Sequence, residues 1–420
     1  MSGLGGRWSP TLAAIAVVAF WAIAVVPATT LPMTDPDTWW HIRAGIQVLD
    51  TSSIPTTDTW SIAGDGRPWT SQDWLSNVVM ALGFRAGTWG PTLLSIGYGL
   101  MGIAAIWLLW SAIGVRRPSV GWLARPAWLL LGLVLAASVL GVRVQVVDLL
   151  LTALVVNVLW RYVAHRRRAA LAWLPVVAVA WVNLHAGFPL LFLVGGAVLV
   201  GEAVDRWLHR EVEAGPLGWS ELGWLALSLL GAAVALMLNP NGPAIYRYPF
   251  DTLGIGVLGS FVGEWQPARL DAPAGQLLAL FVLVGILPAL LFAGRRLRTA
   301  DGLILIGLTF MAVTAVRFLL VAGPVGAAFV CLGLAPVISE SRIGRACAGV
   351  LARLERPRRG LGGGVNSVLV AVVLLIGLGL TIVRVAPAGQ ASAVAEAYPV
   401  RAVDWLGQHA PGERIFNRYE

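Results

Sequence analysis

The chain gathers several ionisable residues in one short stretch, M-T-D-P-D-T-W-W-H-I-R at 33–43. Asp35, Asp37, His41 and Arg43 lie there beside two tryptophans. A carboxylate in such a cluster could act as a general base, and an arginine could stabilise a developing negative charge. Carboxylate and imidazole together suit Mn²⁺ or a similar ion. Asp37 and His41 are therefore candidate ligands for a divalent metal cofactor, Mg²⁺ or Mn²⁺.

The spacing of this stretch predicts an amphipathic helix in the membrane interface, because apolar residues at positions 39, 42, 46 and 49 follow the helical period. We expect Asp37 to be its N-cap, with Thr38 as the alternative. Asp37 and His41 then share one face. Capping and anchoring explain Asp37 and the tryptophans but not Asp35, His41 and Arg43. We interpret the cluster as a functional site, since ionisable groups at a membrane face more often belong to one.

The following residues offer more carboxylates, in I-P-T-T-D-T-W-S-I-A-G-D-G-R-P and S-Q-D-W-L. Asp58 and Asp73 are each as consistent with a substrate site as with a capping role. Asp65 is most simply a turn residue. The letters T-W-S-I predict a short strand. A second interfacial helix is expected after Ser71, with Ser71 as its cap and Asp73 in its first turn.

The composition predicts that helices within a membrane position these residues. Hydrophobic residues make up 57% of the 420 and charged ones 12%, and the mean hydropathy is +0.76. All 30 basic residues are arginines, and the net charge of +8 does not indicate nucleic-acid binding in a membrane protein. Two cysteines indicate neither a disulfide framework nor a zinc site. Eleven apolar runs predict spans at 11–32, 91–114, 122–141, 144–163, 169–184, 187–206, 222–239, 275–293, 301–316, 318–338 and 365–384.

The arginines predict the topology, because most of them fall in loops that share one side with the N-terminus. We expect a cytoplasmic N-terminus, an extracytoplasmic C-terminus and three outer segments, at 33–90, 240–274 and 385–420. Residues 1–384 form the membrane domain in this interpretation. The segment 385–420 is the start of a small extracytoplasmic unit, with a helix in Y-P-V-R-A-V-D-W-L and a strand in R-I-F-N-R-Y-E, and we expect it to be truncated.

Polar residues also occur at the outer ends of other predicted spans. They include Arg143, Asp148, His185 and Arg317, while Glu264 precedes a tryptophan in the second outer segment. Each could be an ordinary turn residue or an interfacial anchor. For Arg317 and His185 we favour function, since these turns face the side of the aspartate cluster. An arginine there suits a lipid phosphate, and an acidic residue next to tryptophan is typical of sugar-binding surfaces.

The first outer segment resembles that of the GT-C glycosyltransferases. Asp37-Thr-Trp-Trp-His-Ile-Arg43 is similar to the D-P-W-F-N-Y-R of oligosaccharyltransferase catalytic subunits. The stretch from D-P-D-T-W-W-H-I-R-A-G to Q-D-W-L is more similar still to bacterial membrane proteins described as GT-C-like. The resemblance implies that Asp37 is catalytic and metal-binding. The W-W-D-Y-G motif of the oligosaccharyltransferases and a second-loop D-x-D do not occur, so an oligosaccharyltransferase proper is not expected.

The sequence therefore predicts an all-α, multi-pass GT-C-like protein of the bacterial inner membrane. It would pass a sugar from a polyprenyl phosphate to an envelope glycan, lipid or protein, with Asp37 as base and Asp35 as its catalytic partner. Residues expected to contact substrate or lipid phosphate are His41, Arg43, Asp58, Asp73, Arg143, His185, Glu264 and Arg317. A transporter or lipid-binding scaffold is the main alternative, and an envelope polysaccharide polymerase or ligase is another. A transporter would place ionisable residues at the membrane midplane and contain internal repeats, which the sequence does not indicate.

Overall fold

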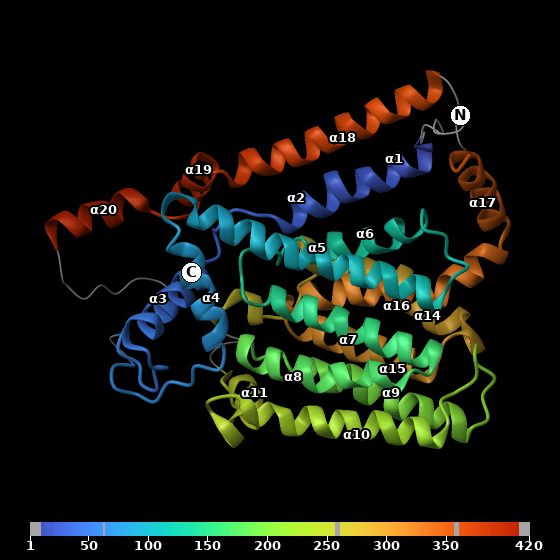
Figure 1. The fold of residues 1–420 in the computed structure, drawn as a ribbon, viewed down its shortest axis with the longest axis horizontal. Coiled ribbons are helices and arrows are strands. Elements are labelled where there is room, and N and C mark those ends of the chain that lie inside the picture. The colour runs from blue at the N-terminus through green and yellow to red at the C-terminus, as the bar shows by residue number, and fades with distance from the viewer. Residues whose placement is uncertain (1–9, 62–63, 257–260, 357–360, 411–420) are drawn as a thin grey trace, which may run out of the picture.

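The computed structural model describes residues 10–61, 64–256, 261–356 and 361–410, and within them the protein is helical (Figure 1). Two antiparallel bridge residues, Thr57 and Pro68, are the extent of strand pairing in this described part. The main helices are α1 (Leu12–Ala19), α2 (Val26–Thr29), α3 (Pro36–Thr51), α4 (Trp74–Phe84), α5 (Gly90–Arg116), α6 (Arg125–Ala136), α7 (Val146–His165), α8 (Trp173–Leu184), α9 (Pro189–Trp207), α10 (Trp219–Ala235), α11 (Tyr248–Leu253), α13 (Pro273–Phe281), α14 (Leu287–Phe292), α15 (Thr299–Thr314), α16 (Leu319–Glu340), α17 (Arg342–Leu354), α18 (Leu361–Val385), α19 (Pro387–Ala397) and α20 (Val400–His409).

Each of the eleven predicted apolar runs overlaps a helix, and seven helices are long and apolar enough to cross a membrane. These seven are Leu12–Thr29, Gly87–Arg116, Val146–His165, Trp219–Leu238, Pro273–Phe292, Val316–Glu340 and Gly364–Val385. The first and fifth contain π-helical turns that join α1 to α2 and α13 to α14. Helices α6, α8 and α15 are apolar but shorter. The protein is therefore an all-α, multi-pass membrane protein, as its hydropathy predicted.

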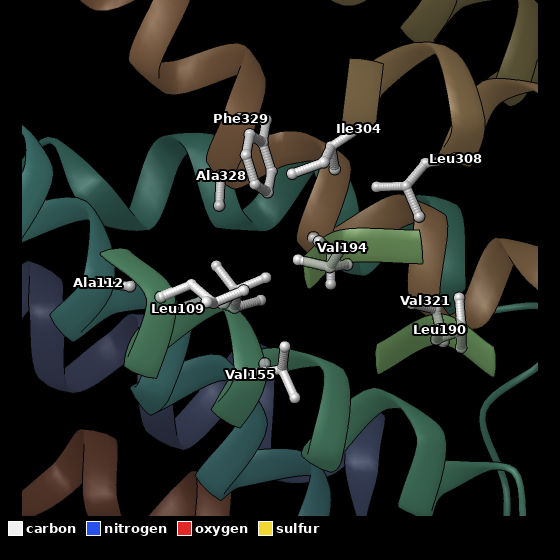
Figure 2. Packing of buried hydrophobic residues seen from close by; sticks show 14 of the residues in the cluster. Leu109, Ala112, Val155, Leu190, Val194, Ile304, Leu308, Val321, Ala328 and Phe329 are labelled. Atoms are coloured by element: carbon white, nitrogen blue, oxygen red, sulfur yellow. The ribbon is translucent and has the colours of Figure 1, made fainter. Parts of the chain in front are cut away.

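Helices α7 and α16 are the most buried of the membrane-crossing helices and form the centre of the bundle. Figure 2 shows the packing around them, where Leu109 of α5, Val155 of α7 and Phe329 of α16 meet side chains of α9 and α15. The outer helices instead expose apolar side chains, including Leu291, Phe310 and Leu375. Such an apolar exterior is what a surface in contact with lipid requires. Helix α18 lies alongside α1 at one edge of the bundle (Figure 1).

The first outer segment folds as a pair of helices, α3 and α4, at one end of the bundle (Figure 1). They pack closely at Gly45, where an added Cβ would lie 1.9 Å from the carbonyl oxygen of Asn77. Helix α3 begins at Pro36, two residues earlier than an N-cap at Asp37 predicts. Asp35 is the N-cap and accepts the N–H of Asp37 at 3.0 Å, so the assignment of the cap to Asp37 or Thr38 was wrong. The reason is Pro36, whose fixed φ suits the first helical position.

Two other local predictions for this segment are also wrong. The described part of T-W-S-I, residues 59–61, does not form a strand, because Asp58 folds the chain into a turn by accepting the N–H groups of Trp60 and Ser61. The last residue of that stretch lies outside the described residues. Helix α4 begins at Trp74 rather than just after Ser71. The Ser71 hydroxyl donates to the carbonyl of Pro55 at 3.0 Å and so is not available as a cap.

The C-terminal segment returns to the same end of the bundle. The predicted helix around V-R-A-V-D-W-L is confirmed as α20, whereas the predicted strand R-I-F-N-R-Y-E lies entirely outside the described residues. Buried Gln390 of α19 accepts the N–H of Met33 at 3.0 Å and donates to Ser95 at 2.6 Å. The hydroxyl of Tyr398 donates to the carbonyl of Thr34 at 2.7 Å. The tail thus fixes the chain immediately before Asp35.

Candidate functional site

Four of the residues singled out in the sequence form a continuous chain of ion pairs. Arg143 contacts Asp35, with 3.2 Å between Nε and Oδ2, and also pairs with Glu264. Glu264 in turn pairs with Arg317 at 3.1 Å. These residues come from four distant segments, so the fold assembles them. We call Asp35, Arg143, Glu264 and Arg317 the charge network.

The Asp35 end of the charge network is held by α3. The hydroxyl of Thr38 donates to the backbone carbonyl of Val142 at 2.5 Å, which ties the first turn of α3 to the loop that carries Arg143. Met33 and Ile42 pack with Val142 in a small apolar cluster beneath this contact. In D-P-D-T, Asp35 is the N-cap and Pro36 is the first helical residue. This start of α3 places the Asp35 carboxylate beside the guanidinium of Arg143.

The Glu264 end is held by two short turns. The N–H of Val316 donates to the carbonyl of Gln266 at 3.0 Å, which joins the segment after Glu264 to the turn before Arg317. The Arg317 guanidinium lies over the ring of Trp265, 4.2 Å from its centroid. A guanidinium over the face of tryptophan is attracted by the ring, which helps to hold it in position. Arg317 is therefore fixed by both Glu264 and Trp265.

The charge network contains two carboxylates and two guanidiniums. Because these groups are partly buried, their pKa values depend on both burial and the neighbouring charges. Burial raises the pKa of Asp35 above its ordinary value, and the opposing effect of Arg143 does not cancel it. Burial lowers the pKa of Arg143, but the carboxylates of Asp35 and Glu264 outweigh this and raise it. Asp37 adds a further negative charge nearby, and its Oδ1 accepts the indole N–H of Trp40 at 3.2 Å. Arg143 thus sits among three carboxylates.

A second polar cluster lies where α3 meets α4. The buried imidazole of His41 contacts Oδ1 of Asn77 at 2.6 Å and Oδ2 of Asp73 at 3.3 Å, both through Nδ1. Burial lowers the pKa of His41, although Asp73 and Asn77 oppose this. Both groups that Nδ1 contacts are acceptor oxygens, so the tautomer that donates from Nδ1 fits this arrangement. His41 and Asp73 face each other across the helix pair rather than pointing to solvent.

A third cluster surrounds Asp148, at the start of α7. Its Oδ1 accepts the indole N–H of Trp181 at 2.8 Å, and its Oδ2 lies 2.7 Å from Nδ1 of His185. The turn between α8 and α9 passes so close that a Cβ on Gly187 would lie 2.1 Å from the carboxylate. A carboxylate in apolar surroundings needs a polar partner. Asp148 has two, the indole of Trp181 and the imidazole of His185.

Hydrogen bonds join the first outer segment to the turn between α8 and α9. Trp74 donates to Oδ1 of Asn183 at 2.8 Å, and Ser76 donates to the carbonyl of Leu184 at 2.6 Å. The amide of Asn239 donates to the carbonyl of Val182 at 2.8 Å. The charge network and the two histidine clusters therefore belong to one polar end of the bundle.

Two predicted residues lie apart from these clusters. Arg43 is exposed on α3. Asp58 is exposed, and hydrogen bonds from Ser61 lower the pKa of its carboxyl. Its contacts are those of a turn-forming residue. Asn77 and Gln390, which the sequence analysis did not single out, are buried at this end of the bundle. Their signal in the sequence is weak, since each is one amide in an otherwise apolar or small-residue helix.

The residues at this end do not fit a resident divalent metal. Both oxygens of Glu264 face arginines, one oxygen of Asp35 faces Arg143, and Nδ1 of His41 faces Asn77. In the described residues, no three His, Cys, Asp or Glu side chains are arranged to hold an ion. The positive charges at this end that pair with these carboxylates are those of Arg143 and Arg317.

Helix order, membrane spans and this polar end together define an all-α, multi-pass membrane protein. The solved structures that it resembles include the oligosaccharyltransferase of Archaeoglobus fulgidus in the apo form, with a TM-score of 0.56. A second is the archaeal oligosaccharyltransferase AglB from Archaeoglobus fulgidus in complex with an inhibitory peptide and a dolichol-phosphate, with a TM-score of 0.53. Each match has 14% sequence identity and covers 96% of this chain and 58% of the other. The chain thus spans less than two thirds of those proteins.

The sequence comparisons do not extend this likeness. No protein-family model matches the chain, and no curated protein matches it. The similarity at 14% identity is one of fold, and it agrees with the GT-C-like fold that the D-T-W-W-H-I-R stretch predicted.

Proposed function

We propose that the protein is a membrane glycosyltransferase that takes a sugar from a polyprenyl-phosphate donor. The acceptor is a glycan, lipid or protein of the cell envelope. The enzyme would lie in the bacterial plasma membrane with its N-terminus in the cytoplasm, and the charge network would face the extracytoplasmic side. The observation that carries this proposal is the charge network itself, which pairs buried arginines with carboxylates at one end of a GT-C-like fold.

The reaction needs a base and a cation, and the site contains both. The acceptor hydroxyl oxygen forms a bond to the anomeric carbon, while the bond from that carbon to the phosphate oxygen breaks. The hydroxyl proton passes to the carboxylate of Asp37. The bonding electrons leave with the phosphate, whose added negative charge is stabilised by Arg143 and Arg317. Asp35 holds Arg143 at the phosphate position.

Glu264 accounts for how two arginines remain in place before the donor arrives. It pairs with both guanidiniums, and its negative charge between them reduces their mutual repulsion in a partly buried site. A donor phosphate carries the same charge and the same type of acceptor oxygen, so it can replace Glu264 as their partner. The second of these solved structures, a complex with a dolichol-phosphate, supports a lipid phosphate as ligand for a protein of this fold.

The test is native mass spectrometry of the full chain in lipid nanodiscs with polyprenyl-phosphate sugars. We compare the wild type with Asp37→Asn and Arg317→Ala, and with Arg269→Ala as matched control. Arg269 is an exposed arginine in the same outer segment, paired with Asp271. Donor binding is expected to survive Asp37→Asn and the control and to weaken in Arg317→Ala, while sugar transfer is lost in Asp37→Asn.

Two results would overturn the proposal. Equal donor binding in the wild type and Arg317→Ala would remove the phosphate role of the network. No selective binding in any form would favour the transporter or scaffold interpretation. Transfer onto a growing polysaccharide rather than a single acceptor would reassign the same site to a polymerase or ligase.

A further inference from the structure

A second charged and aromatic site lies at the opposite end of the bundle. Helix α9 starts beside the His185 turn and ends at Trp207, and α10 starts at Trp219 and returns toward Asn239. Between the end of α9 and the start of α10 is a cavity of about 420 Å³. Its lining is Arg206, Trp207, His209, Arg210, Pro216 and Trp219. This volume is in the range of small-ligand sites.

The two arginines of this cavity differ in their partners. Arg210 is engaged, because Nη1 lies 2.6 Å from both Oδ1 of Asp205 and the hydroxyl of Thr299. Arg206 lies over the ring of Trp219, 5.8 Å from its centroid. Within the described part of the chain, Arg210 forms an ion pair with Asp205, whereas Arg206 forms none. Arg206 therefore presents a guanidinium without a close carboxylate partner to the cavity.

The rim of the cavity is apolar and exposed. The side chains of Trp207, Leu208 and Trp219 are 71%, 54% and 60% exposed. In a membrane protein such residues at the end of a helix contact acyl chains and the interface. A ligand that satisfies the whole site therefore combines an anionic head with an apolar tail.

We propose that this cavity binds the phosphate of an anionic phospholipid headgroup. Arg206 pairs with the phosphate, Trp219 holds the guanidinium by cation–π contact, and the acyl chains lie over the exposed rim. Basic pockets between membrane helices are established binding sites for anionic headgroups. The proposal is independent of sugar transfer, because the cavity and the charge network lie at opposite ends of the helices.

The test is lipid titration of the delipidated full chain in uncharged detergent, followed by native mass spectrometry. The probes are phosphatidylglycerol, phosphatidylcholine, and inorganic phosphate with glycerol phosphate. Variants are Arg206→Gln and Trp219→Leu, with Arg168→Gln as matched control. Arg168 is an exposed arginine that stacks on Trp224 at 5.1 Å but does not line the cavity.

Phosphatidylglycerol is expected to bind the wild type and the control with equal affinity. Its affinity for Arg206→Gln is expected to be about fivefold lower. Trp219→Leu is expected to weaken binding in the same direction, which keeps the test valid if one variant folds poorly. Equal loss in Arg168→Gln, or no loss in either cavity variant, would overturn the proposal. Binding of free phosphate as tight as lipid, or equal binding of phosphatidylcholine, would overturn the assignment to an anionic lipid.

Discussion

Arg143 and Asp35 form a direct ion pair, with 3.2 Å between Nε and Oδ2, although four helices, α3 to α6, separate them in the sequence. The side chains are 10% and 15% exposed, so water does not screen the pair as it would at a surface. Arg143 also pairs with Glu264. One guanidinium therefore links the first and second outer segments, and its removal should separate them.

The first prediction concerns this guanidinium. Arg143→Gln is expected to lower kcat for sugar transfer by about 10²–10³, because it removes a preorganised donor at the departing phosphate. Arg143→Lys keeps the charge but loses the planar fork, so we expect only partial rescue. Steady-state kinetics with a polyprenyl-phosphate sugar measure both. Activity in Arg143→Gln close to that of Arg269→Gln would contradict a role for Arg143 in the reaction.

The raised pKa of Asp35 predicts how stability varies with pH. Because the folded protein binds this proton more tightly than the unfolded chain, the free energy of unfolding falls as pH rises from about 3.8 through the folded pKa. Above that window the penalty for ionising Asp35 is fully present. Asp35→Asn removes the penalty, so the wild type should lose stability relative to the variant as pH rises through the window.

The measurement is thermal unfolding of both proteins in the same detergent at a series of pH values. Asp58→Asn is the control, since its carboxyl is exposed and its pKa is lowered, so its stability difference should change in the opposite direction. A difference between the wild type and Asp35→Asn that is constant with pH would show that Asp35 ionises as easily in the fold as in the unfolded chain.

The glycine that approaches Asp148 gives a steric prediction. A Cβ at Gly187 would lie 2.1 Å from the Asp148 carboxylate, so Gly187→Ala must displace the carboxylate or the turn that carries His185. We expect a loss of about 1–3 kcal/mol in stability, as for other overpacked sites. Gly196→Ala on α9 is the matched control, because its added Cβ meets no atom within 4 Å. Equal unfolding temperatures for the two variants would refute the close approach.

The partners of the carboxylates predict the response to chelators. Glu264 and Asp35 are neutralised by arginines rather than arranged as metal ligands, so EDTA is expected to leave sugar transfer unchanged. The assay is transfer by the purified protein, with and without EDTA and with added Mg²⁺ or Mn²⁺. Loss of activity in EDTA that is restored by Mn²⁺ would assign a metal to the site and return Asp37 and His41 to the role of ligands.

The sequence predicted the helices and the side of the bundle that carries the polar residues, because hydropathy and arginine bias act locally along the chain. It also identified Asp35, Arg143, Glu264 and Arg317 as unusual at the ends of spans. It did not predict that they pair with each other. Those pairs join residues that are distant in sequence, and their choice depends on how α3, the loop before α7 and two short turns pack. The misplaced cap at Asp37 was a local error, since Pro36 already indicated Asp35.

The C-terminal segment holds the chain that precedes Asp35 in place through hydrogen bonds. Gln390 is buried and connects Met33, Ser95 and the carbonyl of Pro91 through its side-chain amide. Gln390→Ala leaves these polar groups without their partner, at a cost of about 1–3 kcal/mol in stability. Because Met33 immediately precedes the Asp35 loop, the variant should also weaken donor binding.

Gln276→Ala, which removes one exposed hydrogen bond to Leu270, is the control and should change neither stability nor donor binding. Thermal unfolding and donor titration of both variants measure this, and unchanged donor binding in a destabilised Gln390→Ala would limit the tail to a structural role.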